Sequence, residues 1–189
     1  WSNAAFFLVA GALNGPLSCS GLQSDSKQGD KRIIQELKRF GAKVSENEGA
    51  VLVEPGTLAG SDVDMSEIPD LLPILAVLAC FARGSSHFYN AARLRIKESD
   101  RLNAVKNMIV ALGGKAEEKQ DSLTVHGQHE LRGGVVDGCR DHRIVMAAAI
   151  AATRCRQNVQ IINAQAVRKS YPDFFQVYSS IGGIVKNGV

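Results

Sequence analysis

Three segments of the chain are apolar over three turns or more, and they restrict the fold more than any other feature. Residues 4–13 and 69–82 carry no polar stripe of the kind that a surface helix shows, and a third such segment runs over 141–153. Each is shorter than the roughly twenty apolar residues that a membrane span needs. We therefore expect three buried helices, with sheets and amphipathic helices packed around them.

The apolar helices belong to a longer pattern that recurs along the chain. Each is followed by a short strand, an amphipathic helix and a glycine turn into another strand. We expect the strands near 17–22, 87–89 and 159–162, the amphipathic helices over 30–40, 99–112 and 172–181, and the turns at Gly41, Gly114 and Gly183. This order predicts an α/β fold in which residues 1–189 form one lobe, built from three units of about 1–60, 61–130 and 131–189.

The amphipathic helices have one apolar face each. The residues on these faces are Ile33, Ile34, Leu37 and Phe40 in the first helix, Leu102, Val105, Ile109 and Leu112 in the second, and Phe174, Tyr178 and Ile181 in the third.

Composition excludes several other classes of protein. Hydrophobic residues make up 45% of the 189 and charged residues 22%, which is ordinary for a globular protein, and the formal net charge of +3 does not by itself indicate nucleic-acid binding. The four cysteines are far apart without a CxxC pair, and no HxxxH or HExxH spacing occurs. We expect reduced thiols, a cytoplasmic location and no metal site. No basic region precedes the first apolar run, so we expect no signal peptide, and the start at Trp1 indicates a chain cut from a longer one.

Charged residues are concentrated where helices are expected to begin. The densest tract is RLRIKESDRL at 93–102, and three others are Asp70 after Pro69, the triplet at 141–143 and the triplet at 168–170. Helix starts present unpaired backbone N–H groups with a partial positive charge. If these starts gather at one edge of the lobe, then Lys97, Arg101, Arg143 and Lys169 would form a receptor for a small polyanion bearing phosphates or carboxylates.

Simpler interpretations exist for each of these residues taken alone. Asp70, Ser99 and Asp141 are also suitable helix caps. Arg101 with Glu98, or Lys97 with Asp100, would make ordinary surface ion pairs, which stabilise a protein little. Taken together, four tracts that all place charge at helix starts favour a site. Aromatic residues are only 6% of the chain, which disfavours nucleic acid as the ligand.

Four tracts, in order, resemble the signature segments of the enolpyruvylshikimate phosphate synthase family: IPDLLPILAVLA, RLRIKESDRL, DGCRDHRIVMAAAIA and VRKSYPDFF. The resemblance extends over essentially the whole chain and corresponds to the C-terminal part of a family chain about twice as long. It implies one lobe of the two-lobed enolpyruvyl transferase fold, made of three βαβαββ-type units whose helix starts face a central cleft. The N-terminal lobe is absent from this sequence.

The resemblance also implies a reaction. The family transfers the enolpyruvyl group of phosphoenolpyruvate to the 5-hydroxyl of shikimate 3-phosphate and releases phosphate, in the biosynthesis of aromatic amino acids. It uses no metal or organic cofactor, and we expect the full-length protein to be a cytoplasmic monomer that binds neither nucleic acid nor membrane. Because the other lobe carries half of the site, we expect the 189 residues to fold but to be inactive alone.

By the same resemblance, Asp70 is the base for the hydroxyl and Glu98 handles the methylene proton. The implied substrate-binding residues are Lys97, Arg101, Arg143 and Lys169, and also Arg93, which stands where some members have asparagine. Two alternatives are a UDP-N-acetylglucosamine enolpyruvyl transferase, which shares the architecture but lacks the KESDR and DHR pair, and a non-catalytic module that binds phosphate or RNA ends.

Overall fold

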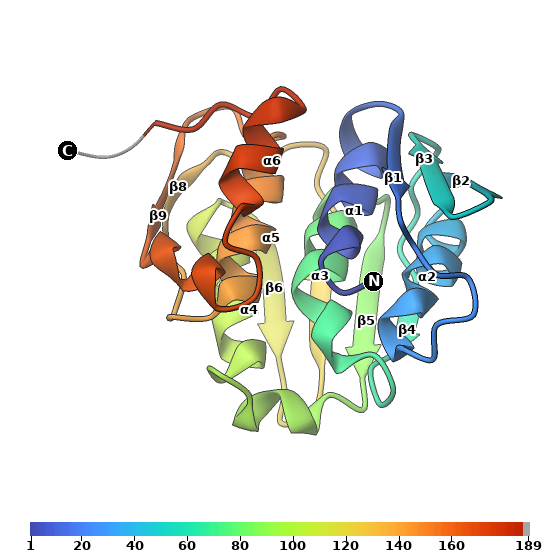
Figure 1. Ribbon diagram of the computed structural model, residues 1–189. Helices are drawn as coiled ribbons and strands as arrows, with labels where there is room; N and C mark the ends of the chain where they lie inside the picture. Colours follow the sequence, from blue (N-terminus) through green and yellow to red (C-terminus); the bar gives the residue numbers. More distant parts are fainter. Residues whose placement is uncertain (187–189) are drawn as a thin grey trace.

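Three apolar helices form the centre of the molecule. In the computed structural model, which describes residues 1–186, helices α1 (Ala4–Asn14), α3 (Leu72–Cys80) and α5 (His142–Ala152) contact one another. Almost every residue of the three helices is buried, Arg143 being one of the few exceptions. Figure 1 shows them running through the middle of the lobe, with sheet strands on either side. The expected burial of these segments is confirmed, because side chains without polar groups gain about 1.5–3 kcal/mol each on leaving water.

Three sheets surround this core. The first has the antiparallel order β1-β3-β2, formed by β1 (Leu17–Ser20), β2 (Lys43–Asn47) and β3 (Ala50–Glu54). The second has the order β4-β5-β7-β6, from β4 (Asp62–Asp64), β5 (Ser85–Tyr89), β6 (Lys115–Glu118) and β7 (Leu123–His126), with only β4 and β5 parallel. The third pairs β8 (Gly134–Asp137) with β9 (Val159–Ile162) in parallel.

The amphipathic helices pack their apolar faces inward as expected, with one exception. They are α2 (Ile33–Arg39), α4 (Arg101–Ala111) and α6 (Phe174–Ser180), and short 3₁₀ helices η1 (Gly29–Arg32), η2 (Pro69–Leu71), η3 (Ala92–Ile96) and η4 (Ala164–Lys169) lie in the connections. The exception is Ile181, which follows α6, is 46% exposed and lines a hollow at the surface.

The three amphipathic helices end in the same way. The residue after the C-cap is a glycine with positive φ, and the next amide donates to a carbonyl five residues back, which is the Schellman motif. Only glycine takes this left-handed conformation without a steric cost. The sequence prediction placed the second and third turns one residue late, since the left-handed residues are Gly41 (φ 95°), Gly113 (φ 87°) and Gly182 (φ 100°).

Among the described residues, the three sheets differ in how many neighbours their corresponding strands have. The expected strand after the third glycine turn is not present at 183–186, and the rest of that segment lies outside the described residues. In the four-stranded sheet, β5 lies between a parallel strand and an antiparallel strand. By comparison β1 has only an antiparallel neighbour and β9 only a parallel one. One edge of each of these two strands is therefore unpaired within residues 1–186.

The unpaired edge of β9 also lacks the charges that normally protect a sheet edge. Edge strand β2 carries Lys43 and Glu46, and edge strand β6 carries Lys115 and Glu117. Strand β9 has the sequence VQII, and Ile162 is 47% exposed. An uncharged edge with an exposed apolar side chain favours pairing with another strand.

We predict that the 189-residue chain associates with itself through β9. Sedimentation equilibrium over a concentration series is expected to show a dimer that Ile162→Lys weakens, because the new charge opposes strand pairing. Val110→Lys is the matched control, since Val110 is 48% exposed on α4 and away from a sheet edge. A wild-type chain that stays monomeric throughout the series contradicts the prediction.

Candidate functional site

Four segments far apart in the sequence meet at one cluster of charges. Ion pairs connect Lys169 to Glu98, Glu98 to Arg101, Arg101 to Asp70, and Asp70 to both Lys97 and Arg143. The cluster lies where η2 leads into α3, where η3 leads into α4, at the start of α5 and at the end of η4. The expected gathering of charged tracts is therefore present, and it includes six of the seven residues predicted for the site, namely Asp70, Lys97, Glu98, Arg101, Arg143 and Lys169.

Arg101 lies at the centre of this cluster. Its side chain is 1% exposed, and its guanidinium donates from Nη1 to Asp70 Oδ1 (2.6 Å), from Nη2 to Glu98 Oε2 (2.5 Å) and from Nε to Asp141 Oδ2 (2.7 Å). Burial by itself lowers the pKa of Arg101, but Asp141, Glu98 and Asp70 outweigh burial and raise it. Arg101 is thus a permanently charged cation whose donors are turned toward protein carboxylates rather than toward solvent.

Asp70 is surrounded by cations. Its carboxylate accepts from Arg101, lies 3.2 Å from Lys97 Nζ and accepts from Arg143 Nη2 at 3.1 Å. Partial burial acts to raise the pKa of Asp70, while Arg143, Arg101 and Lys97 lower it, and the net result is a lowered pKa. The carboxylate is therefore ionised at neutral pH and is paired with all three cations.

Glu98 is held in a similar way. Lys169 Nζ donates to Glu98 Oε1 at 3.1 Å, on the opposite oxygen from Arg101. Partial burial opposes ionisation, but the backbone amide of Glu98, the Lys169 ammonium and Arg101 prevail and lower the pKa of Glu98 to about 2. In this arrangement Glu98 carries no proton at neutral pH.

The cap interpretation is right for only one of the three residues considered. Asp141 caps α5 by accepting from the Arg143 amide at 3.0 Å. Asp70 makes no cap hydrogen bond, and α4 is capped by Asp100 rather than by Ser99. Ser99 Oγ instead donates to Asp141 Oδ2 at 3.0 Å. The sequence prediction of the site left out Asp141 and Ser99, although Asp141 ahead of a buried helix was a visible signal.

The surface-pair interpretation is only partly correct. Arg101 does pair with Glu98, but in a buried position. Lys97 pairs with Asp70 instead of Asp100, which pairs with Arg95 at 3.0 Å.

Arg93 lies outside the ion-pair cluster. It is exposed on η3 and lines a hollow of about 360 Å³ together with Asp70, Asp30, Ser66 and other residues. The hollow adjoins the cluster through Asp70, so Arg93 is near the site without pairing to its carboxylates among the described residues.

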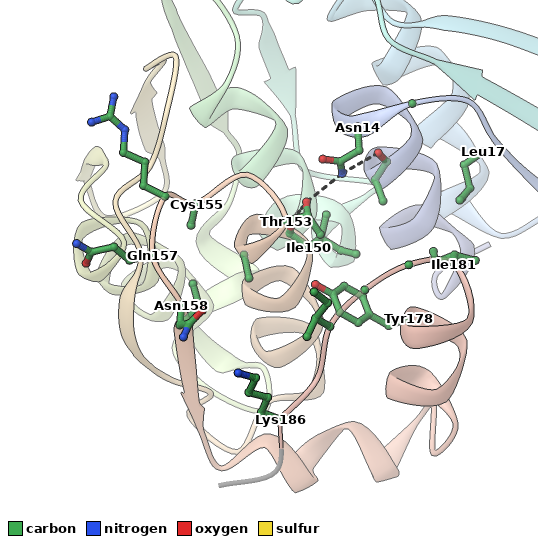
Figure 2. Close-up of a pocket in the computed structure, with 18 of the residues that line it drawn as sticks. Asn14, Leu17, Ile150, Thr153, Cys155, Gln157, Asn158, Tyr178, Ile181 and Lys186 are labelled. Carbon is green, nitrogen blue, oxygen red and sulfur yellow. Dashed lines mark hydrogen bonds between the residues drawn. The ribbon is translucent and has the colours of Figure 1, made fainter.

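Another, wider hollow lies elsewhere. It has a volume of about 840 Å³ and is lined by the C-terminal ends of α1 and α5, by the start of β9 and by residues after α6. Figure 2 shows Asn14, Thr153, Tyr178 and Lys186 around it, with Asn14 Nδ2 donating to Thr153 Oγ1 at 2.9 Å. None of the charged residues of the cluster lines this hollow, so it is separate from the candidate site.

Two kinds of feature are absent from the described residues. Residues 1–186 contain no group of three or more His, Cys, Asp or Glu side chains arranged to hold a metal ion. Among the helices of the same residues, none combines the length and apolar character that crossing a membrane requires.

The fold and the charged cluster can now be compared with those of known protein families. An EPSP synthase structure from Acinetobacter baumannii superposes with a TM-score of 0.89 at 24% identity, covering 98% of this chain and 46% of that one. At this identity the likeness shows the fold alone, which is one lobe of the two-lobed enolpyruvyl transferases. A family profile described as EPSP synthase (3-phosphoshikimate 1-carboxyvinyltransferase) matches residues 1–178. The chain belongs to this family.

Curated relatives agree with the family match. The 3-phosphoshikimate 1-carboxyvinyltransferase of Clostridium kluyveri is 44% identical over 183 residues, which are 97% of this chain and 43% of the relative. The enzyme of the same name from Brachyspira hyodysenteriae is 41% identical over 187 residues, covering 98% of this chain and 44% of the relative. The chain thus spans less than half the length of these relatives.

We predict that Glu98 contributes stability that is lost in acid. Its pKa is about 2 in the folded state against an ordinary value of 4.5, so the contribution is complete above about pH 4.5 and disappears as the pH falls toward 2. Urea unfolding at pH 7 is expected to show Glu98→Gln less stable than wild type by roughly 1–2 kcal/mol. The difference should shrink steadily in titrations at pH 5, 4 and 3.

Glu117→Gln is the control for this series, because the Glu117 side chain is 77% exposed. If the free energy of unfolding differs by the same amount between wild type and Glu98→Gln at every pH, the lowered pKa of Glu98 is contradicted.

Proposed function

We propose that this chain forms one lobe of an enzyme that transfers the enolpyruvyl group from phosphoenolpyruvate to the 5-hydroxyl of shikimate 3-phosphate and releases phosphate. The observation that carries the proposal is that one guanidinium, that of Arg101, holds two partly exposed carboxylates, Asp70 and Glu98, within a ring of cations. The family membership and the relatives' names support the same reaction.

The reaction needs two proton-handling groups, and the cluster offers two. In the addition step the 5-hydroxyl oxygen bonds to C2 of phosphoenolpyruvate, its proton leaves to a base, and the C3 methylene gains a proton. In the elimination step C3 gives up a proton, the C2–O bond to phosphate breaks and phosphate departs. We assign Asp70 as the base for the hydroxyl and Glu98 as the group that exchanges the proton of C3.

The cations have a separate role. Phosphoenolpyruvate carries a carboxylate and a phosphate, and charge increases on its oxygens during the reaction. We assign Lys97, Arg143 and Lys169 to these anions, because their side chains retain some exposure (29%, 11% and 59%). Arg101 is buried among carboxylates and is assigned to orienting Asp70 and Glu98, and Arg93 is assigned to the adjoining hollow.

The ion pairs within the cluster oppose the assigned proton transfers. A carboxylate with a lowered pKa is a weak base, and Glu98 without a proton has none to give. An anionic substrate that draws Lys97, Arg143 and Lys169 to itself would remove these cations from the two carboxylates and raise their pKa values. Substrate binding thus exchanges internal ion pairs for substrate ion pairs and adjusts the carboxylates for proton transfer.

The remaining half of the site would come from the rest of the family chain. We propose that residues 1–189 are a single lobe of three units, about 1–60, 61–130 and 131–189, and that a second lobe faces the charged cluster in a monomeric enzyme. Phosphoenolpyruvate and shikimate 3-phosphate are the proposed ligands, and a cytoplasmic location stays a prediction.

We predict that the 189-residue chain does not release phosphate from phosphoenolpyruvate and shikimate 3-phosphate, whereas a completed enzyme does. The completed enzyme is a chimera in which this chain replaces the matching 183-residue region of the Clostridium kluyveri relative. Asp70→Asn or Glu98→Gln in the chimera is expected to lower kcat by about 100-fold or more, because each removes a proton-handling group.

Glu117→Gln and Asp121→Asn are matched controls on exposed surface and are expected to keep full activity. Turnover by the isolated chain contradicts the two-lobe proposal. A chimera that is inactive while the intact relative is active, or one that binds oligonucleotides with a steep salt dependence, contradicts the proposed reaction.

We predict that the acid limb of the pH profile moves when substrate binds. The kcat/KM profile reports the free enzyme, in which the pKa of Asp70 is lowered, and the kcat profile reports the complex, in which the cations face the substrate. Activity should therefore fall at a higher pH in the kcat profile than in the kcat/KM profile. Coincident limbs, or a kcat limb at the lower pH, would show that the ion pairs do not exchange.

A further inference from the structure

We propose that Asp141 is a positioning residue, which fixes the orientation of Arg101 and Arg143 for the reaction without touching substrate. This inference rests on the proposed function and extends it to a residue outside the set assigned to protons and anions.

Asp141 cannot reach a ligand, because its side chain is 0% exposed. Both carboxylate oxygens are occupied by groups of the cluster. Oδ2 accepts from Arg101 Nε at 2.7 Å and from Ser99 Oγ at 3.0 Å, and Oδ1 accepts from the Arg143 amide at 3.0 Å and from Arg101 Nη2 at 3.3 Å. One buried side chain therefore binds three residues that belong to or adjoin the site.

The contact with Arg101 determines where its other donors point. A guanidinium is planar and rigid, so a carboxylate that binds the edge formed by Nε and Nη2 fixes the plane of the whole group. With that edge held by Asp141, Nη1 faces Asp70 and the remaining Nη2 hydrogen faces Glu98. The relative positions of the two proton-handling carboxylates thus depend on Asp141 through Arg101.

The contact with Arg143 fixes the start of α5. Because Asp141 caps this helix through the Arg143 amide, it sets the position from which the Arg143 side chain extends to Asp70. The preceding residues, Cys139 (φ 50°) and Arg140 (φ 52°), both have the left-handed conformation, which is unfavourable for residues other than glycine. A strained turn directly before Asp141 is consistent with a backbone selected for the placement of this carboxylate.

A direct role in proton transfer does not fit the contacts of Asp141. His142 Nδ1 is 3.9 Å from Asp141 Oδ1 and makes no hydrogen bond among the described residues. Asp141 is separated from solvent, and its contacts within hydrogen-bonding distance are with Arg101, Ser99 and the Arg143 backbone. Acting through these groups is therefore the role that its surroundings allow.

The test is Asp141→Asn in the chimeric enzyme. The amide cannot bind the Nε and Nη2 edge of Arg101 with two acceptors, so Arg101 is expected to turn away from Asp70. We expect kcat to fall by about 100-fold, the effect of a misplacement of about 1 Å in an active site. With Arg101 turned away, the acid limb of the kcat/KM profile should move to higher pH, a change that a loss of folded protein alone does not produce.

Asp100→Asn is the matched control. Asp100 also caps a helix, by accepting from the Asn103 amide at 3.2 Å, and also pairs with one arginine, Arg95. It makes no contact with Asp70 or Arg143, so kcat and the acid limb are expected to stay unchanged.

Ser99→Ala is the second variant, and it tests the positioning role of Asp141 if Asp141→Asn does not fold. It removes one hydrogen bond to Asp141 while keeping the carboxylate, and we expect kcat to fall about fivefold in a chimera that stays folded under assay conditions, with the urea midpoint lowered only slightly. The outcome that overturns the role of Asp141 requires an active parent chimera. In that chimera, a folded Asp141→Asn variant would keep full kcat and the same acid limb of the kcat/KM profile. If Asp141→Asn does not fold, the same result for Ser99→Ala overturns the role. If the parent chimera does not turn over while the intact relative does, the proposed function itself fails.

Discussion

A buried guanidinium is stable in a protein only where carboxylates offset the loss of its hydration, which costs several kcal/mol for an ion taken out of water. Arg101 meets this condition through Asp70, Glu98 and Asp141, which come from three different segments. The starts of α3, α4 and α5 are therefore required to meet at one point. Apolar burial is not directional, so the charged cluster adds a directional constraint to the packing of these helix starts.

The same cluster explains how one lobe can hold several cations together. Lys97, Arg101, Arg143 and Lys169 face Asp70, Glu98 and Asp141, which leaves one positive charge in excess. Without the carboxylates the cations would repel one another and move apart. The carboxylates keep the cations in place, and under the proposed function an anionic substrate would take their position.

Much of the fold could be predicted because its signals are local. The absence of a polar stripe correctly indicated that α1 and α3 are buried, and strand β9 was expected at 159–162 and lies at Val159–Ile162. Apart from the one-residue shift at Gly113, the departures were near the end of the chain, where Ile181 is exposed and no strand is present at 183–186. Periodicity predicts an apolar face but does not say whether another element is present to cover it.

The sequence by itself determined which helices are buried and that charged tracts stand at their starts, since both depend on residues within a few turns of one another. Only the tertiary structure decided which charged residues pair. Lys97 pairs with Asp70 and not with Asp100, and Arg93 lies outside the cluster. Asp141 binds Arg101 in addition to capping α5. These contacts join residues 27, 40 and 73 positions apart, such as Lys97 with Asp70, Arg101 with Asp141, and Arg143 with Asp70. Only the packing of α3, α4 and α5 brings such residues within hydrogen-bonding distance, and no local pattern contains that information.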